Sequence, residues 1–148
     1  MLTIKVVENN EEFNKIIIVR AIVYMHEQNC PYDEEFDLND FTATHIIGLI
    51  DNEPILCARI RYIDESAKLE RLAIRPSFRG KKYGHKLLQF LIEFCKKKGF
   101  NKIFLHAQKR LVPFYRSYGF SLIGNGLRIP VQTDHGFRRK LTTDSTGN

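Results

Sequence analysis

The stretch 69–88, LERLAIRPSFRGKKYGHKLL, brings cations and two glycines together between an apolar run and an amphipathic run. The first turn of a helix carries free backbone N–H groups and a partial positive charge, so it attracts anions. Gly80 and Gly84 let a ligand approach the backbone closely, because they carry no side chain. The loop 79–84 and the helix after it therefore predict a site for a phosphate-bearing ligand.

The flanking segments supply the elements that hold this loop. Residues 69–74 mix apolar and charged side chains without helical spacing. Pro76 disfavours helix at Arg75, so a strand is expected to end there. Gly99 is expected to stop the helix that follows the loop. That helix is predicted because apolar residues recur at spacings of three and four: Leu87, Leu88, Leu91, Ile92 and Cys95.

Strand, Arg-Gly-x-x-x-Gly loop and helix together resemble the acyl-CoA-binding motif of the GNAT superfamily of N-acetyltransferases, Gln/Arg-x-x-Gly-x-Gly/Ala. Arg79 and Gly84 match its first and last positions, and Lys82 stands where the middle Gly is usual. The resemblance implies acetyl-CoA as the co-substrate. It also implies cofactor contacts from the end of the strand and from the loop: Leu72, Ala73, Ile74, Arg79, Gly80, Lys81, Lys82, Tyr83, Gly84 and His85.

A second block, residues 108–120 (QKRLVPFYRSYGF), resembles the family's next segment, which ends in Phe-Tyr-x-x-x-Gly-Phe. Its Leu-Val-Pro-Phe-Tyr run is similar to that of arylalkylamine N-acetyltransferases, whose tyrosine is the general acid that reprotonates the CoA thiolate. The resemblance therefore points to Tyr115 as the general acid. The alternative is an aromatic side chain packed at a helix end, with its hydroxyl bonded to backbone. The block also implies three further cofactor contacts: Gln108, Phe114 and Tyr118.

The stretch 27–45, EQNCPYDEEFDLNDFTATH, resembles the ElaA-like branch of the superfamily, in which Glu-Gln, Cys-Pro-Tyr, Asp and a later His recur in this order. Ile129, Pro130 and His135 correspond to an Ile-Pro-His segment of that branch, with longer spacing here. The same stretch holds an acidic run that could attract a cationic amine or form a solvated loop: Asp33, Glu34, Glu35, Asp37 and Asp40.

The resemblance implies direct transfer of an acetyl group to a primary amine, on a small molecule or a protein, in a ternary complex. The other function left open is a catalytically inactive domain that senses acyl-CoA. Glu70 is the candidate general base, since alternation places it on the strand face of Leu72 and Ile74, where an apolar slot would raise its pKa. Its alternative is a surface residue, or one ion-paired with Arg71 or Lys68.

Three histidines compete with Glu70, because neutral imidazole suits proton removal near neutral pH: His45, His106 and His135. Each is weighed against a structural role, and a water chain could replace any side chain. No set of His, Cys, Asp and Glu residues has metal-ligand spacing, so no metal is expected. Cys30, beside Pro31, is expected to be structural, since direct transfer needs no covalent intermediate.

Composition bounds the class of protein. The chain has 148 residues, 43% of them apolar, which suits one domain. There is no apolar run of about 18 residues and no signal segment, so neither a membrane span nor secretion is expected. Cys30, Cys57 and Cys95 are expected to be free thiols in the cytoplasm. The net charge of +6 makes nucleic-acid binding an alternative function, but the basic loop already suits an anionic cofactor. A homodimer stays open.

The pattern of elements predicts an α+β fold, with a mixed, mostly antiparallel sheet and helices on both faces. The strands around 68–74 and 103–106 are expected to run parallel and to splay, which would open a slot for the cofactor. A helix capped by Asn10 is expected over 13–24, and a short helix over 112–118. The domain covers 1–141, and 142–148 form a disordered tail. The other expected strands are 2–7, 45–50, 55–63, 120–125 and 136–141.

Overall fold

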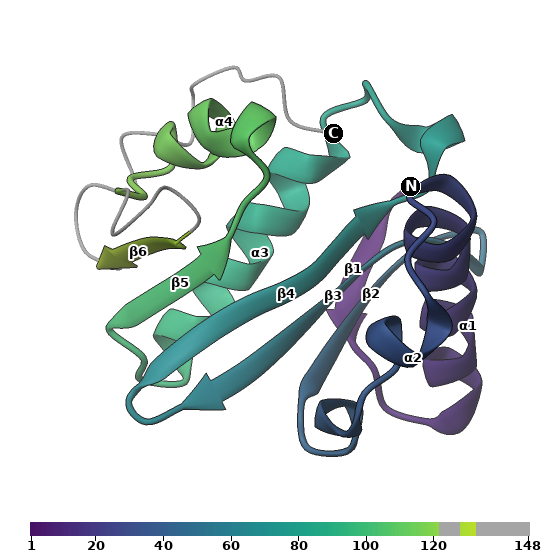
Figure 1. Ribbon diagram of the computed structural model, residues 1–148, viewed down its shortest axis with the longest axis horizontal. Coiled ribbons are helices and arrows are strands. Elements are labelled where there is room, and N and C mark those ends of the chain that lie inside the picture. Colours follow the sequence, from purple (N-terminus) through teal and green to yellow (C-terminus); the bar gives the residue numbers. More distant parts are fainter. Residues whose placement is uncertain (122–127, 133–148) are drawn as a thin grey trace.

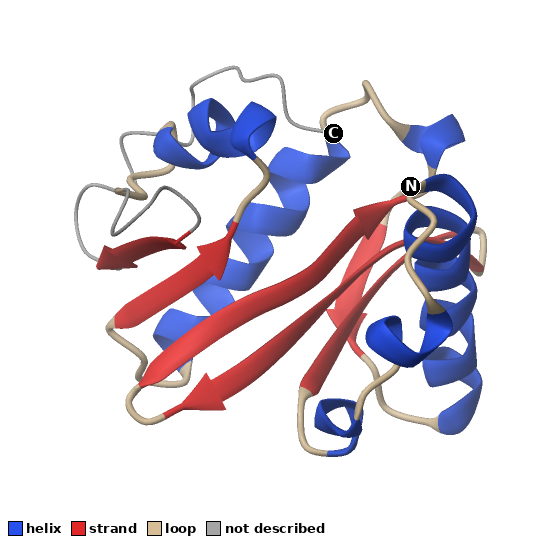
Figure 2. Cartoon of the chain, viewed as in Figure 1, coloured by secondary structure: helices blue, strands red, loops and turns tan. Residues whose placement is uncertain are grey.

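The computed structural model of the chain describes residues 1–121 and 128–132. Its centre is a six-stranded sheet in the order β1-β2-β3-β4-β5-β6 (Figures 1 and 2). β4 and β5 run parallel and the other neighbours are antiparallel, which confirms the predicted mixed α+β sheet. The strands are β1 Thr3–Val6, β2 Thr44–Ile50, β3 Glu53–Ile63, β4 Ser66–Ile74, β5 Lys102–His106 and β6 Arg128–Gln132.

Two long helices, α1 Asn10–Arg20 and α3 Tyr83–Lys97, cover opposite faces of this sheet (Figure 1). Successive side chains of a strand point to opposite faces. Ile46 of β2 accordingly packs with the apolar face of α3, whereas Ile47 packs with that of α1. The short helices are α2 Tyr32–Glu35, η2 Leu38–Phe41, η3 Pro76–Phe78, η4 Lys109–Leu111 and α4 Val112–Arg116.

The N-terminal helix differs from the prediction at both ends. Asn9, rather than Asn10, caps α1, and its side-chain oxygen accepts a hydrogen bond from the backbone N–H of Glu12 at 2.9 Å. Beyond Arg20 the chain continues as a π-helix, η1 Ala21–Glu27, so the expected single helix is two segments. Turns of π-helix are rare and are frequent at functional sites. This one borders the cavity described below.

The β2–β3 hairpin closes over two residues. Asp51 and Asn52 both adopt positive φ, 50° and 68°, as in a type I′ turn. β3 therefore begins at Glu53 rather than at the predicted Ile55. The hairpin itself is confirmed, and its register pairs Ile50 with Glu53.

The C-terminal predictions lie mostly outside the described residues. Of the strand expected over 120–125, only Phe120 and Ser121 are described, and neither is in a strand. The strand expected over 136–141 and the tail 142–148 fall wholly outside. The described strand in this region is β6, which pairs antiparallel with β5, from Lys102 with Gln132 to His106 with Arg128.

The parallel pair separates part-way along β4. β5 pairs with β4 from Ser66–Lys102 to Leu69–Leu105, and β4 then continues to Ile74 without β5 beside it. A β-bulge lies at this point, because residues 70–73 of β4 face only residues 57–59 of β3, and Arg71 has a φ of 53°. A bulge bends its strand and increases its twist. β4 therefore diverges from β5 and leaves one edge open, as Figure 1 shows.

A buried ionic cluster holds the segment 30–41 against the sheet. Arg20, at the end of α1, is 1% exposed and donates to Glu35 at 2.6 Å and to Asp40 at 2.9 Å. It also donates to the backbone oxygen of Glu35 at 2.8 Å. A charge buried this deeply is stable only when its partners satisfy it closely. Arg20 therefore fixes α1 and the segment 30–41 to one another.

Arg59 of β3 joins the same cluster from the sheet. It is also 1% exposed, and it donates to Asp37 at 2.8 Å, to Asp40 at 2.9 Å and to Glu70 at 2.6 Å. Both interpretations of the acidic run are therefore wrong for Glu35, Asp37 and Asp40, which are ion-paired rather than solvated or available to a cationic amine. The exposed members of the run are Asp33 and Glu34.

Replacing Arg59 by Met should lower the free energy of unfolding by about 3–5 kcal/mol, because three carboxylates lose their shared cation. Urea unfolding at pH 7 measures the change. Arg61→Met is the matched control, since Arg61 is 28% exposed and pairs with Glu70 at 3.1 Å. A pair that exposed contributes less than about 1 kcal/mol. Equal losses in the two variants would contradict a cluster centred on Arg59.

Candidate active site

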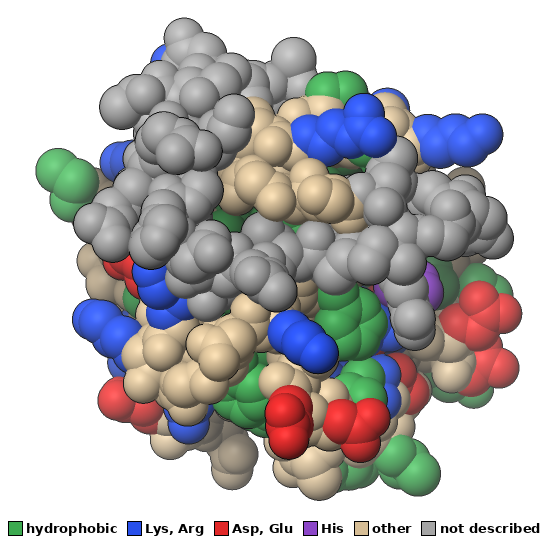
Figure 3. All heavy atoms as spheres, turned by 90° about the vertical axis from the view of Figure 1, so that its left-hand side faces the viewer, with side chains coloured by type: hydrophobic (Ala, Val, Ile, Leu, Met, Phe, Trp, Pro, Cys, Tyr) green, Lys and Arg blue, Asp and Glu red, His purple; other side chains and the backbone are tan. Residues whose placement is uncertain are grey.

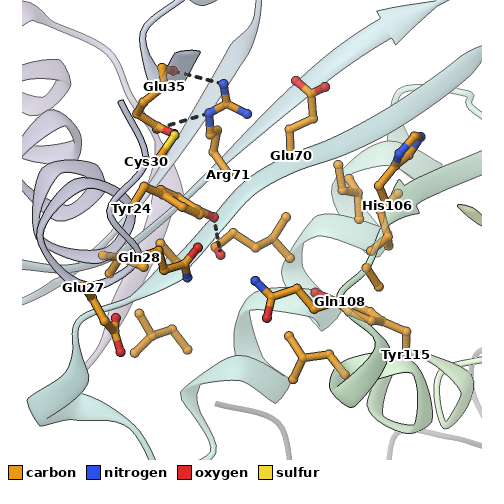
Figure 4. A pocket seen from close by; sticks show the side chains of 18 of the residues that line it. Tyr24, Glu27, Gln28, Cys30, Glu35, Glu70, Arg71, His106, Gln108 and Tyr115 are labelled. Atoms are coloured by element: carbon orange, nitrogen blue, oxygen red, sulfur yellow. Dashed lines mark hydrogen bonds and ion pairs between the residues drawn. The ribbon is translucent and has the colours of Figure 1, made fainter. Parts of the chain in front are cut away.

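A cavity of about 400 Å³ lies where β4 and β5 separate. Its walls come from η1 and the segment after it, from β4, and from β5 with η4 and α4 (Figure 4). Glu35 and Arg71 lie at one end of the cavity, and Glu27 and Tyr115 lie towards the other (Figure 4). The predicted slot between the parallel strands is thus present.

The wall that β4 contributes contains the three strand residues expected to contact the cofactor, Leu72, Ala73 and Ile74. This part of β4 has no pairing with β5, so its edge can accept an extended ligand as an added strand. The carbonyl of Leu72 accepts a hydrogen bond from the hydroxyl of Tyr24 at 2.8 Å. Because Tyr24 belongs to η1, this bond ties the π-helix to the bulged part of β4.

Tyr115 projects into the cavity from α4 (Figure 4). It is 6% exposed, and its ring packs edge-on against Phe114 and Phe120. No residue within the described part of the chain bonds to its hydroxyl, so the predicted alternative of a backbone-bonded hydroxyl does not occur there. Burial raises the pKa of Tyr115 to about 12. The phenol therefore keeps its proton at neutral pH.

Glu70 does not have the environment predicted for a base. Its carboxylate accepts hydrogen bonds from Arg59 at 2.6 Å and from Arg61 at 3.1 Å, and it pairs with Lys68 at 2.9 Å. Burial would raise the pKa of Glu70, but the hydrogen bonds from Lys68 and Arg59 outweigh burial, so the pKa is lowered. The predicted rise in pKa is wrong, because cations from two strands surround the carboxylate. Glu70 is instead ion-paired with Lys68, which was the alternative expected from the sequence.

The three histidines weighed as bases are placed differently. His45 is 8% exposed, lies outside the cavity wall and bonds through Nε2 to the backbone oxygen of Asp40 at 2.9 Å. Burial lowers its pKa, so the imidazole is neutral at neutral pH. His106, at the end of β5, does line the cavity. His135 lies outside the described residues.

The glycine loop forms the helix entrance that the sequence predicts. Gly80 has a φ of 79°, and a Cβ placed there would meet nothing within 4 Å. Lys82 precedes α3 with a φ of 65° and a ψ of 20°, which is the left-handed conformation that glycine adopts freely. Lys82 therefore adopts the same left-handed backbone conformation that the usual glycine could adopt at this position. Gly84 is buried in the first turn of α3.

Arg79, the first residue of the motif, is engaged within the protein. It donates to both carboxylate oxygens of Glu27, at 2.6 and 2.7 Å, and its Nε donates to the backbone oxygen of Ile74 at 2.9 Å. The hydrogen bonds from Arg79 lower the pKa of Glu27, which is the last residue of η1. The pair therefore ties the glycine loop to the helical segment that also carries Tyr24.

The remaining residues expected to contact the cofactor lie in three places: the cavity wall, the loop outside it and the core. Gln108 lines the cavity, whereas the loop residues 80–85 lie outside its wall. Phe114 and Tyr118 are 5% and 1% exposed in the core. The hydroxyl of Tyr118 lies 2.8 Å from Nδ1 of His85, and Phe114 packs edge-on against the same imidazole. Phe114 of α4 and Tyr118 in the turn after it thus contact the first turn of α3.

Several residues of the cavity wall were not expected from the sequence, among them Tyr24, Gln28 and Arg110. Tyr24 fits the apolar spacing of a helix, and that spacing does not reveal a π-helix. The Glu-Gln pair of the ElaA-like block was the available signal for Gln28. For Arg110 the signal was its position two residues after Gln108, within a segment already assigned to the cofactor.

Other chemistry finds no support in the part of the chain that the structure describes. There, no three His, Cys, Asp or Glu side chains are grouped to hold a metal ion. None of the helices in residues 1–121 is long and apolar enough to cross a membrane. The three cysteines are free, as expected, with Cys57 and Cys95 buried and Cys30 half-buried.

Comparison with known proteins identifies the family. Residues 11–120 match the acetyltransferase (GNAT) family. The chain belongs to this family. This GNAT protein is 33% identical to ElaA of Escherichia coli over 111 residues, covering 71% of this chain and 72% of ElaA. It is 30% identical to the uncharacterized N-acetyltransferase YjcF of Bacillus subtilis over 118 residues, covering 80% of this chain and 84% of YjcF.

Solved structures agree with the sequence relatives. The crystal structure of E. coli ElaA matches this GNAT protein with a TM-score of 0.77 at 26% identity, covering 88% of this chain and 97% of that one. A GNAT acetyltransferase from Elizabethkingia anophelis, solved with acetyl-CoA bound, shares the fold with a TM-score of 0.64 at 14% identity, covering 88% and 97%. The GNAT fold and the likeness to ElaA predicted from the sequence are confirmed.

Lys82→Gly should raise the free energy of unfolding by up to about 1 kcal/mol, because glycine reaches the left-handed region without the cost of a Cβ. Lys81→Gly is the comparison variant: Lys81 does not have positive φ, so glycine there adds freedom to the unfolded chain, removes the contact of Nζ with the Phe78 ring at 5.7 Å, and should destabilise. Urea unfolding of both variants measures the difference. A Lys82→Gly protein less stable than Lys81→Gly would contradict the assigned loop conformation.

Proposed function

We propose that this GNAT protein transfers an acetyl group from acetyl-CoA to a primary amine of a small molecule or a protein, directly, in a ternary complex. The observation that carries the proposal is the hydroxyl of Tyr115, which faces the slot, keeps its proton and has no partner among the described residues. A departing thiolate requires such a donor. The free thiols of the chain suit a reducing compartment, so we propose the cytoplasm as the site of the reaction.

The residues present suit acetyl-CoA. The open edge of β4 over residues 72–74 can pair with the amides of the pantetheine arm. The N-terminus of α3, preceded by Gly80 with open space around it, suits a pyrophosphate. Gln108 also lines the cavity, and its amide can bond to the same arm.

Each group then has one chemical task. The amine nitrogen attacks the carbonyl carbon, the carbon–sulfur bond breaks, and Tyr115 gives its proton to the thiolate, which leaves as CoA. Two carboxylates at the far end of the cavity, Glu35 and Glu70, are both ion-paired. We therefore assign the proton lost by the amine to a water chain in the cavity rather than to Glu70. Solvent returns a proton to Tyr115 after each turnover.

Melting temperatures with acetyl-CoA, CoA and ATP at equal concentrations test the cofactor assignment. A ligand at 100 times its Kd adds about 2.7 kcal/mol of stability, which is a visible shift. Shifts with both CoA species and none with ATP are expected, followed by thiol release in a panel of small amines and lysine peptides. Binding without thiol release from any amine would favour the acyl-CoA sensor. No shift with either CoA species would overturn the proposal.

Tyr115→Phe should lower kcat by about 10²–10⁴-fold while the Kd for acetyl-CoA stays within a few-fold, because it removes the proton donor and keeps the ring packing. Thiol release and acetyl-CoA titration measure the two quantities. Tyr62→Phe is the control, since it removes a hydroxyl that bonds to Thr44 at 2.9 Å, away from the cavity. Unchanged turnover in Tyr115→Phe would remove Tyr115 as the general acid.

A further inference from the structure

The charges around the cavity are almost fully paired. Four cations line it: Lys68, Arg71, Arg79 and Arg110. The first three are ion-paired, Lys68 with Glu70 at 2.9 Å, Arg71 with Glu35 at 3.1 Å and Arg79 with Glu27 at 2.6 Å. Arg110 has no hydrogen bond or ion pair with any residue that the structure describes. It is also exposed, so its guanidinium is available to a ligand.

Because Arg79 is paired within the protein, Arg110 is the better candidate for binding a phosphate group. Phosphate groups bound at the loop would be expected to attract the arginine that opens the motif. Arg79 instead makes three hydrogen bonds, two to Glu27 and one to the backbone of Ile74. Its charge is therefore neutralised within the protein. An anionic ligand at this end of the cavity gains more from a cation that has no carboxylate partner.

Arg110 lies at the right end of the cavity for that purpose. It belongs to η4, which precedes the helix that carries Tyr115. Its charge is among those that lower the pKa of Glu27, and it also acts on Tyr115, so the guanidinium lies within electrostatic reach of both residues. Figure 1 shows η4 and α4 beside the end of α3 that receives the glycine loop. In the side view of Figure 3, Lys and Arg side chains protrude at the top of the molecule.

We propose that Arg110, and not Arg79, is the side chain that binds a phosphate group of CoA, and that Arg79 acts as a positioning residue for the cofactor loop. This inference rests on the proposed function and adds to it a ligand contact outside the glycine loop. The planar guanidinium of Arg110 can donate two parallel hydrogen bonds to phosphate oxygens. CoA offers two such groups, the pyrophosphate and the 3′-phosphate.

Calorimetric titration of CoA and of 3′-dephospho-CoA into the full chain tests this, at two NaCl concentrations. Arg110→Gln should weaken CoA binding about tenfold, the effect of losing one charge-assisted contact. Its Kd should also depend less on NaCl, because one screened attraction is gone. Lys109→Gln is the matched control: it removes an equal charge from the neighbouring exposed residue, which does not line the cavity, and should stay within about twofold.

The second ligand identifies which phosphate is bound. A loss shared by CoA and 3′-dephospho-CoA supports contact with the pyrophosphate, and a loss confined to CoA supports contact with the 3′-phosphate. Arg79→Gln adds a separate readout, since a positioning residue should lower the melting temperature of the free protein, whereas Arg110→Gln should leave it unchanged.

Three results would overturn the inference. Arg110→Gln could bind CoA as tightly as the wild type. Arg110→Gln and Lys109→Gln could lose affinity equally, which would indicate general charge rather than a contact. Arg110→Gln could lose affinity with an unchanged dependence on NaCl, which would indicate lost packing. Each differs from failure of the proposed function, in which the wild-type chain itself would bind neither CoA nor acetyl-CoA.

Discussion

The site depends on the early end of the β4–β5 pairing. The two parallel strands share only the pairs from Ser66–Lys102 to Leu69–Leu105 before the bulge at Arg71 turns β4 away. An unpaired strand edge presents backbone donors and acceptors that need partners. Here the carbonyls of Leu72 and Ile74 accept hydrogen bonds from Tyr24 and Arg79, and residues 72–74 line the cavity. The same divergence makes the space for a ligand and supplies the groups that would hold it.

That divergence has to be held open, and the buried ionic cluster does so. Arg71, the residue with positive φ in the bulge, pairs with Glu35 at 3.1 Å and donates to its backbone oxygen at 3.0 Å. Glu35 is in turn bonded to Arg20 of α1. A strained backbone persists only where its surroundings over-determine it. The segment 30–41, the sheet and α1 therefore form one supporting structure, in which removal of a single charge leaves several others unsatisfied.

Much of this was accessible from the sequence, because it rests on local rules. The helix entrance at Gly80 and the helix stop at Gly99 both follow from residue type, and both glycines have the positive φ that such positions require. The parallel pair follows from strand–helix–strand order. The Phe-Tyr ending that brings Tyr115 to the cavity follows from a family motif. Lys82 shows where such rules stop. A lysine at the position of the usual glycine suggested a different loop conformation, yet its backbone is left-handed as a glycine's could be.

By itself, then, the sequence determined the elements, their order, the family and the position of Tyr115. Only the tertiary structure decided the electrostatics. The pKa of Glu70 is lowered because Lys68 and, from the neighbouring strand, Arg59 bond to its carboxylate. Arg79 is paired within the protein because Glu27, 52 residues earlier, reaches it. The pKa of a carboxylate and the partner of a guanidinium depend on charges brought together by folding. No spacing along the chain records those distances.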